Sequence, residues 1–207
     1  MGVATHEARL TELVREQPER VLEVGGPPSA VVLLEEVEIG IGRPDLLLLR
    51  IDLQALDLRR HAGLRLHNLA EARVLGAILN GRLDQAGVSA EHTRRLVGRL
   101  ADKGWLELTS LTSVVLDSVL LEAKVSHWGV GVQQLARVRW ASNRAALLVP
   151  TATASRVSRQ SLAANRLGLL SEEDGLLVWE QAPTSVELPP HYDAWLGEMA
   201  LRKLSET

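Results

Sequence analysis

The sequence predicts an α/β protein whose sheet-forming segments are interrupted by a mostly helical insertion. At both ends of the chain, apolar runs of strand length, such as 30–34, 45–51 and 145–149, alternate with segments of helical spacing. From residue 54 to residue 113 the apolar positions follow helical spacing almost throughout. With 207 residues, 46% of them hydrophobic, the chain can form one substantial domain carrying a modest insertion. We therefore expect a mixed-sheet core of order α-β-β-β-α-β-α.

Composition excludes several classes of protein. The chain has no cysteine, which rules out disulfides, thiolate catalysis and cysteine-ligated zinc. Its six histidines lack the spacing of metal ligands, so a zinc site is not expected. The amino-terminal residues do not resemble a signal peptide, and no run of 18 apolar residues occurs. These features predict a cytoplasmic protein.

The amino-terminal part of the core should contain one helix and two strands. Residues 5–17 have an apolar stripe at helical spacing, with Thr5 in the position of an N-cap. After a Gly/Pro breaker, residues 30–39 have the pattern of a strand. Residues 45–51 are continuously apolar after Asp45, which indicates a strand buried on both faces.

The insertion, residues 54–113, should fold as a unit of its own. Its expected elements are a helix at 66–79, a short helix at 83–86, a helix at 90–103 with Ser89 as N-cap, and paired strands at 105–109 and 112–116. This order resembles a winged helix-turn-helix. Such a unit would explain the long interval between the two halves of the core, which we place at 1–53 and 114–207.

The carboxyl-terminal part of the core resumes the alternation of strands and helices. Its expected elements are a strand ending near Glu122, a helix at 126–143, a strand at 145–149, a helix at 155–166, short strands at 167–170 and 176–179, and a helix at 191–204. The core is therefore layered, with helices packed against a sheet.

A carboxylate and an ammonium stand two residues apart at the end of the apolar run 119–125. Because side chains alternate along a strand, Glu122 and Lys124 should project from the same face. A buried charge is costly unless it is paired or bound to a metal. Asp45, which opens the apolar strand 45–51, is the most useful partner. Together the three side chains could form a divalent-metal site for cleaving phosphodiesters.

Three motifs resemble those of the PD-(D/E)XK nuclease superfamily: Gly42-Arg-Pro-Asp45, Glu122-Ala-Lys124, and Gln133-Gln-Leu135 on the helix that follows. The resemblance spans residues 1–53 and 114–180. It implies a restriction-endonuclease-like core and a metal-dependent DNA endonuclease. Restriction-like folds often work as dimers, so a homodimer is a further expectation.

The resemblance also implies a role for each residue of the site. Asp45 and Glu122, with the Ala123 carbonyl as a further ligand, would hold Mg²⁺ or Mn²⁺. Lys124 would orient or deprotonate the attacking water and steady the charged phosphate. Two other side chains complete the expected set: Gln134, with Gln133 as its competitor, would contact the metal shell or the phosphate, and Glu7 would bind metal through water or hold a second ion.

The charge is unevenly distributed along the chain. The net charge is −3, yet residues 54–105 carry nine basic and five acidic side chains. A basic segment in an acidic protein is typical of a nucleic-acid-binding surface. The expected DNA contacts come from His92, Arg94, Arg95 and Arg99. Two alternatives stay open: a DNA-binding regulator that retains the nuclease fold without activity, and a protein-interaction subunit that uses the insertion for docking.

Overall fold

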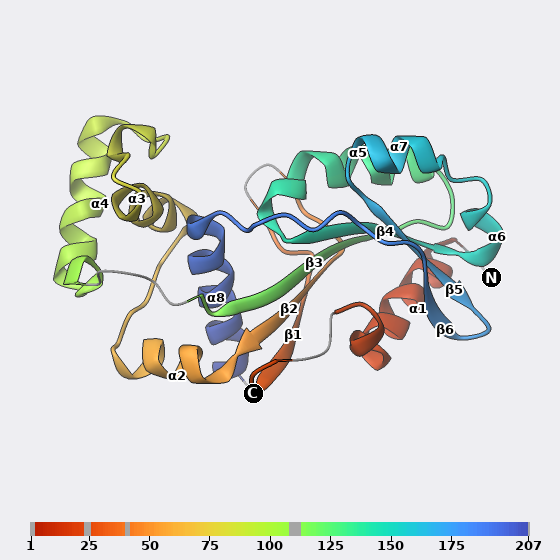
Figure 1. The fold of residues 1–207 in the computed structure, drawn as a ribbon, viewed down its shortest axis with the longest axis horizontal. Coiled ribbons are helices and arrows are strands. Elements are labelled where there is room, and N and C mark those ends of the chain that lie inside the picture. The colour runs from red at the N-terminus through yellow and green to blue at the C-terminus, as the bar shows by residue number, and fades with distance from the viewer. Residues whose placement is uncertain (1–2, 23–25, 40–41, 108–112, 207) are drawn as a thin grey trace. The chain divides into compact units, whose positions relative to one another are not determined.

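The computed structural model describes residues 3–22, 26–39, 42–107 and 113–206 (Figure 1). It confirms the α/β class. One six-stranded sheet has the order β1-β2-β3-β4-β5-β6. β3 pairs in parallel with β4, and β4 pairs in parallel with β5, whereas β5 and β6 are antiparallel, so the sheet is mixed.

The elements follow one another along the chain much as the apolar pattern indicates. The strands are β1 Ser29–Glu35, β2 Leu46–Asp52, β3 Val115–Ala123, β4 Arg144–Pro150, β5 Gly168–Glu173 and β6 Leu176–Gln181. The α-helices are α1 Val3–Glu16, α2 Leu53–His61, α3 Leu69–Leu79, α4 Ala90–Asp102, α5 Trp128–Val138, α6 Thr151–Ala154, α7 Arg159–Ala164 and α8 Pro190–Ser205. In the described parts of the chain, every helix is too short or too polar to cross a lipid bilayer.

The chain forms two compact units. The first contains residues 1–26, 33–50 and 117–187, and the second contains residues 27–32, 51–116 and 188–207. The predicted core ended with the last helix. In the structure, α8 instead belongs to the second unit, where it packs against α3 and α2.

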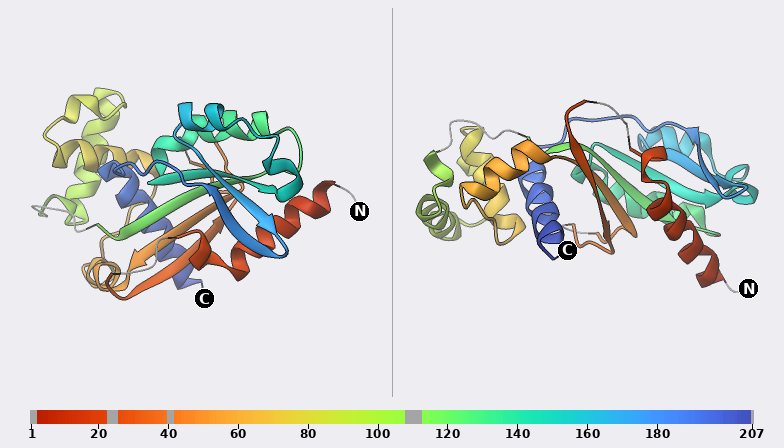
Figure 2. Two further views of the ribbon diagram at one scale, coloured as in Figure 1. Left: turned by 45° about the vertical axis from the view of Figure 1, so that its right-hand side comes forward. Right: turned by 90° about the horizontal axis from the view of Figure 1, so that it is seen from below.

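In the first unit, α1 and α5 cover opposite faces of the sheet (Figures 1 and 2). The buried stripe of α1, which includes Leu10 and Val14, packs in one cluster with Val119 and Leu121 of β3. On the other face, the backbone of α5 approaches so closely that a Cβ at Gly131 would lie 2.6 Å from Leu147 Cδ1. The predicted alternation along β3 is therefore confirmed, with odd-numbered residues facing α1.

The second unit is largely helical, and two sequence predictions fail in it. Residues 53–61 form α2, which was not expected; Asp52 caps it by accepting the backbone N–H groups of Gln54 and Ala55. Residues 105–107 form a 3₁₀ turn rather than the first strand of a wing. That turn directs Trp105 into the helical core of this unit, where it is fully buried. Residues 108–112 of the expected wing lie outside the described residues, and Val115 and Leu116, expected in its second strand, instead begin β3 of the sheet.

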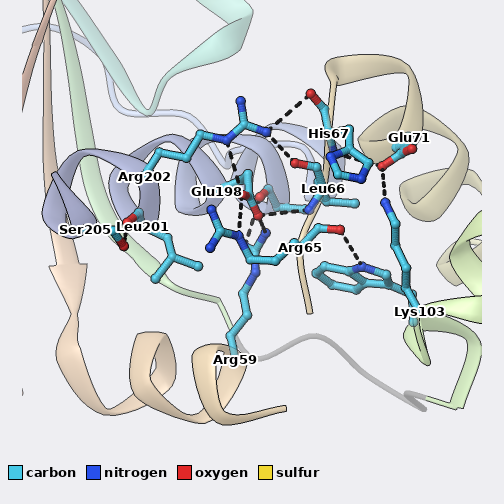
Figure 3. Close-up of polar contacts among 12 residues, drawn as sticks. Arg59, Arg65, Leu66, His67, Glu71, Lys103, Glu198, Leu201, Arg202 and Ser205 are labelled. Carbon is cyan, nitrogen blue, oxygen red and sulfur yellow. Dashed lines mark hydrogen bonds and ion pairs between the residues drawn. The ribbon is translucent and has the colours of Figure 1, made fainter. Parts of the chain in front are cut away.

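Two buried glutamates connect the elements of the second unit (Figure 3). Glu198 of α8 accepts hydrogen bonds from Arg59 at 3.1 Å, from Arg65 at 2.8 Å and from the Leu66 backbone at 2.9 Å. Glu71 of α3 accepts the Lys103 ammonium at 3.0 Å. Because each buried carboxylate has cationic partners, its burial is tolerated and fixes the neighbouring helices.

Candidate functional site

Asp45 lies beside the end of β3, as the sequence predicts. Its Oδ2 accepts the backbone N–H of Ala123 at 2.8 Å. The side chain of Asp45 is 38% exposed, so it retains access to solvent. The chain turn before β2 is held by a close contact, because a Cβ at Gly42 would collide with the Val138 side chain. Segments nearly 80 residues apart in sequence are thus joined at one end of the sheet.

Glu122 and Lys124 form an ion pair next to Asp45. Lys124 Nζ lies 2.8 Å from Glu122 Oε1 and 3.6 Å from Asp45 Oδ2. These two carboxylate oxygens are therefore at most about 6.4 Å apart, close enough to hold one cation after modest side-chain movement. Glu122 is only 1% exposed, and its Oε2 has no hydrogen-bond partner among the described residues. This oxygen is therefore free to accept a cation.

The electrostatics of the pair reflect its partial burial. Burial raises the pKa of Glu122, and the nearby charge of Asp45 adds to the effect, although the hydrogen bond from Lys124 opposes it. Burial alone would lower the pKa of Lys124, but the hydrogen bond and charge of Glu122, with the charges of Asp45 and Glu7, raise it overall. Lys124 is accordingly a protonated ammonium at neutral pH.

Glu7 also reaches this end of the sheet. Its Oε1 accepts the backbone N–H of Val125 at 3.4 Å, and its charge acts on Lys124. Glu7 comes from α1, which packs against β3 on the face opposite to α5. The structure therefore brings Asp45, Glu122 and Lys124 together at one end of the sheet, whereas Glu7 reaches the same end without completing a cluster of three carboxylates.

The two glutamines of α5 lie on its exposed surface. Gly131, which contacts the site, would place a Cβ 3.0 Å from Lys124 Cγ. Gln134 is three residues further along and so lies on a neighbouring part of the same helix face, whereas Gln133 is two residues away and points elsewhere. Helical phase thus favours Gln134 over Gln133, although the structure records no contact from it to the carboxylates.

The donor set fits a hard cation with water in part of its shell. Among the described residues, no three His, Asp or Glu side chains gather closely enough to form a metal site by themselves. Asp45 and Glu122 supply two carboxylates, and Mg²⁺ commonly binds through one or two carboxylates while water completes its octahedron. In the structure, the Lys124 ammonium stands where it neutralises both acids.

The basic residues expected to contact DNA lie on α4. Ser89 caps this helix by accepting the His92 N–H at 3.3 Å, as predicted. Arg94 and Arg95 are exposed, and Arg95 lies 3.9 Å from Glu91. Arg99 is half-exposed and lies 3.6 Å from the buried Glu71. Arg94 and Arg95 are therefore the side chains on this helix best placed for an external anion.

The sequence missed the buried ionic groups that hold the second unit together. Arg59, Glu71 and Glu198 were not singled out, although each is buried and charged. Their partners lie up to 139 positions away in the sequence, so no local pattern predicts these ion pairs. A signal did exist for α2, because Asp52 immediately before Leu53 has the character of an N-cap.

Comparisons with other proteins do not assign the chain to a family. No protein-family profile and no curated protein matches the sequence. A protein of unknown function from Silicibacter pomeroyi has a similar structure, with a TM-score of 0.45 and 11% identity over 100% of this chain and 86% of that chain. A likeness at this level carries no argument about function.

Proposed function

We propose that the chain is a metal-dependent DNA endonuclease with a restriction-endonuclease-like core, positioned on DNA by its inserted helical module. The observation that carries the proposal is the buried Glu122 carboxylate, whose Oε2 is unpartnered beside Lys124 and Asp45. Burying a carboxylate oxygen without a hydrogen-bond partner costs stability. Such a cost is common where the group serves binding or catalysis.

Asp45 and Glu122 would hold Mg²⁺ or Mn²⁺, with the Ala123 carbonyl as a third protein ligand. Such an ion, when bound, lowers the pKa of a coordinated water and offsets charge developing on the phosphate. The Ala123 N–H keeps Asp45 oriented through its 2.8 Å hydrogen bond. A backbone hydrogen bond thus orients the Asp45 carboxylate, and the Glu122 carboxylate is held by its position in β3.

Lys124 would change partners when substrate and metal enter. Its ammonium now neutralises Asp45 and Glu122, so a cation between them would release it toward the phosphate oxygens. A charged donor placed where negative charge develops stabilises the transition state. The raised pKa of Lys124 favours this electrostatic role over proton abstraction at neutral pH. Glu7, which accepts the Val125 backbone N–H, would orient a water molecule at the same end of the sheet.

The inserted module would supply affinity for the duplex through α4. Exposed Arg94 and Arg95 can donate to phosphate oxygens or to guanine edges. Residues 54–105 carry a net positive charge in an otherwise acidic chain, which favours DNA over a protein as the partner of this module. A regulator without activity would share this module but would not need the unpartnered Glu122 oxygen.

The test is cleavage of supercoiled plasmid in Mg²⁺ or Mn²⁺ by the wild type and by Asp45→Asn. Asparagine keeps an oxygen to accept the Ala123 N–H but removes the anionic ligand. We expect nicking to fall at least about a hundredfold while DNA binding persists. Asp57→Asn, at an exposed position of α2, is the matched control and should cleave normally. Undiminished cleavage by Asp45→Asn would refute the assignment.

A further inference from the structure

A cavity of about 690 Å³ opens within the second unit, between α3, the segment after it, and the start of α8. Its lining residues are Arg73, Gly76, Ala77, Asn80, Arg82, Ala86, Gly87 and His191. All of them belong to this unit, and none is acidic. The volume falls in the range of about 300–1,000 Å³ that is usual for small-molecule sites.

Four of the residues that line the cavity are small: Gly76, Ala77, Ala86 and Gly87. A Cβ at Gly76 would lie 3.0 Å from His191 Cβ, so α3 and α8 are in close contact at one wall of the cavity. The backbone carbonyls at the end of α3 are already engaged: the Gly76 carbonyl accepts the Asn80 N–H at 3.1 Å, and the Ala77 carbonyl accepts the Arg82 N–H at 2.8 Å. The polar lining is therefore dominated by side-chain donors.

Those donors are positively charged or neutral. The positive charge of Arg73 contributes to lowering the pKa of the neighbouring His191 and acts on Tyr192 as well. Within the described part of the chain, neither Arg73 nor Arg82 forms an ion pair. Two guanidinium groups thus line one cavity without a carboxylate, although Arg residues elsewhere in this unit pair with glutamates.

We infer that this cavity binds the phosphate monoester group of a small organic molecule of about nucleotide size. Arginine presents N–H donors in a planar fork that matches two phosphate oxygens. Two arginines balance the dianion of a monoester better than the single charge of a phosphodiester within a strand. Asn80 and His191 would add neutral hydrogen bonds, and Ala77 with Ala86 would border the organic part. The inference is independent of the proposed nuclease function.

The experiment is calorimetric titration of the full chain in phosphate-free buffer with inorganic phosphate, adenosine 5′-monophosphate, adenosine and a 5′-phosphorylated oligonucleotide. We expect saturable binding of phosphate and of the nucleotide at one site, and none of adenosine. Arg82→Gln, at an exposed position, should weaken nucleotide binding at least about tenfold. Arg60→Gln, also at an exposed position but on α2, is the matched control and should bind as the wild type does.

Three outcomes would overturn the inference. They are absence of saturable binding, equal loss of affinity in Arg82→Gln and Arg60→Gln, and binding restricted to a 5′-phosphorylated oligonucleotide, which would assign the cavity to a strand end instead. Arg73→Gln gives a second reading. Its thermal unfolding, measured without ligand, separates a loss of binding from a loss of stability.

Discussion

Replacing Lys124 by methionine should destabilise the metal-free protein and increase its response to a divalent cation. The change removes the ammonium 2.8 Å from Glu122 but keeps the apolar stem, so the 1%-exposed carboxylate is left uncompensated. Losing one partner of a fully buried ion pair costs about 3–5 kcal/mol. Because the Lys124 side chain is 18% exposed, water can replace part of the interaction, and we expect a loss of about 2–3 kcal/mol in the free energy of unfolding.

Denaturant unfolding at pH 7, with and without Mn²⁺, measures both effects. Arg60→Met removes a cation at an exposed position of α2 and should change stability by less than about 0.5 kcal/mol. Mn²⁺ should stabilise Lys124→Met more than the wild type, because the cation no longer competes with the ammonium. Wild-type stability of Lys124→Met, together with no gain from Mn²⁺, would refute the reasoning.

Three further predictions follow from other contacts. Gly131→Ala should lower stability by about 1–3 kcal/mol in denaturant unfolding, because the new Cβ meets side chains under α5. Arg94→Ala combined with Arg95→Ala should weaken DNA binding, measured by fluorescence anisotropy, and reduce the dependence of the affinity on salt concentration. An unchanged salt dependence would show that α4 is not the DNA-binding surface. Burial, and to a lesser extent the charge of Arg73, lower the pKa of His191 in the folded protein below its ordinary 6.5. As the pH falls, His191 therefore becomes protonated in the unfolded chain before it does in the folded protein, and the stability should decrease as the pH drops through 6.5. His191→Gln should remove that part of the pH dependence, as thermal unfolding between pH 5 and 8 would show.

The sequence predicted the sheet-forming segments well because burial on both faces leaves a continuous apolar run. β2, whose residues Leu46–Leu49 are at most 1% exposed, shows the pattern clearly. The helix caps at Ser89 and Asp52 depend on local hydrogen bonds, so they too leave a local signal. α2 was nevertheless missed, since its apolar residues do not form a clear stripe.

Contacts between distant segments were harder to predict. Asp45 was placed beside Glu122 and Lys124 from their chemistry, and the structure brings the three together. The 3₁₀ turn at 105–107 was misassigned because Trp105 and its neighbours suit a strand by propensity, whereas packing in the helical core decides the outcome. α8 packs against α3 and α2 in the second unit, and its Glu198 has partners more than 130 positions earlier in the chain, so no local pattern predicts this placement.

The most direct measurement is anomalous scattering from a crystal soaked in Mn²⁺. The proposed function predicts one peak about 2.0–2.3 Å from oxygens of Asp45 and Glu122, with the Lys124 ammonium displaced from between them. A crystal with no peak at this end of the sheet, and with Lys124 still bridging both carboxylates at saturating Mn²⁺, would contradict it.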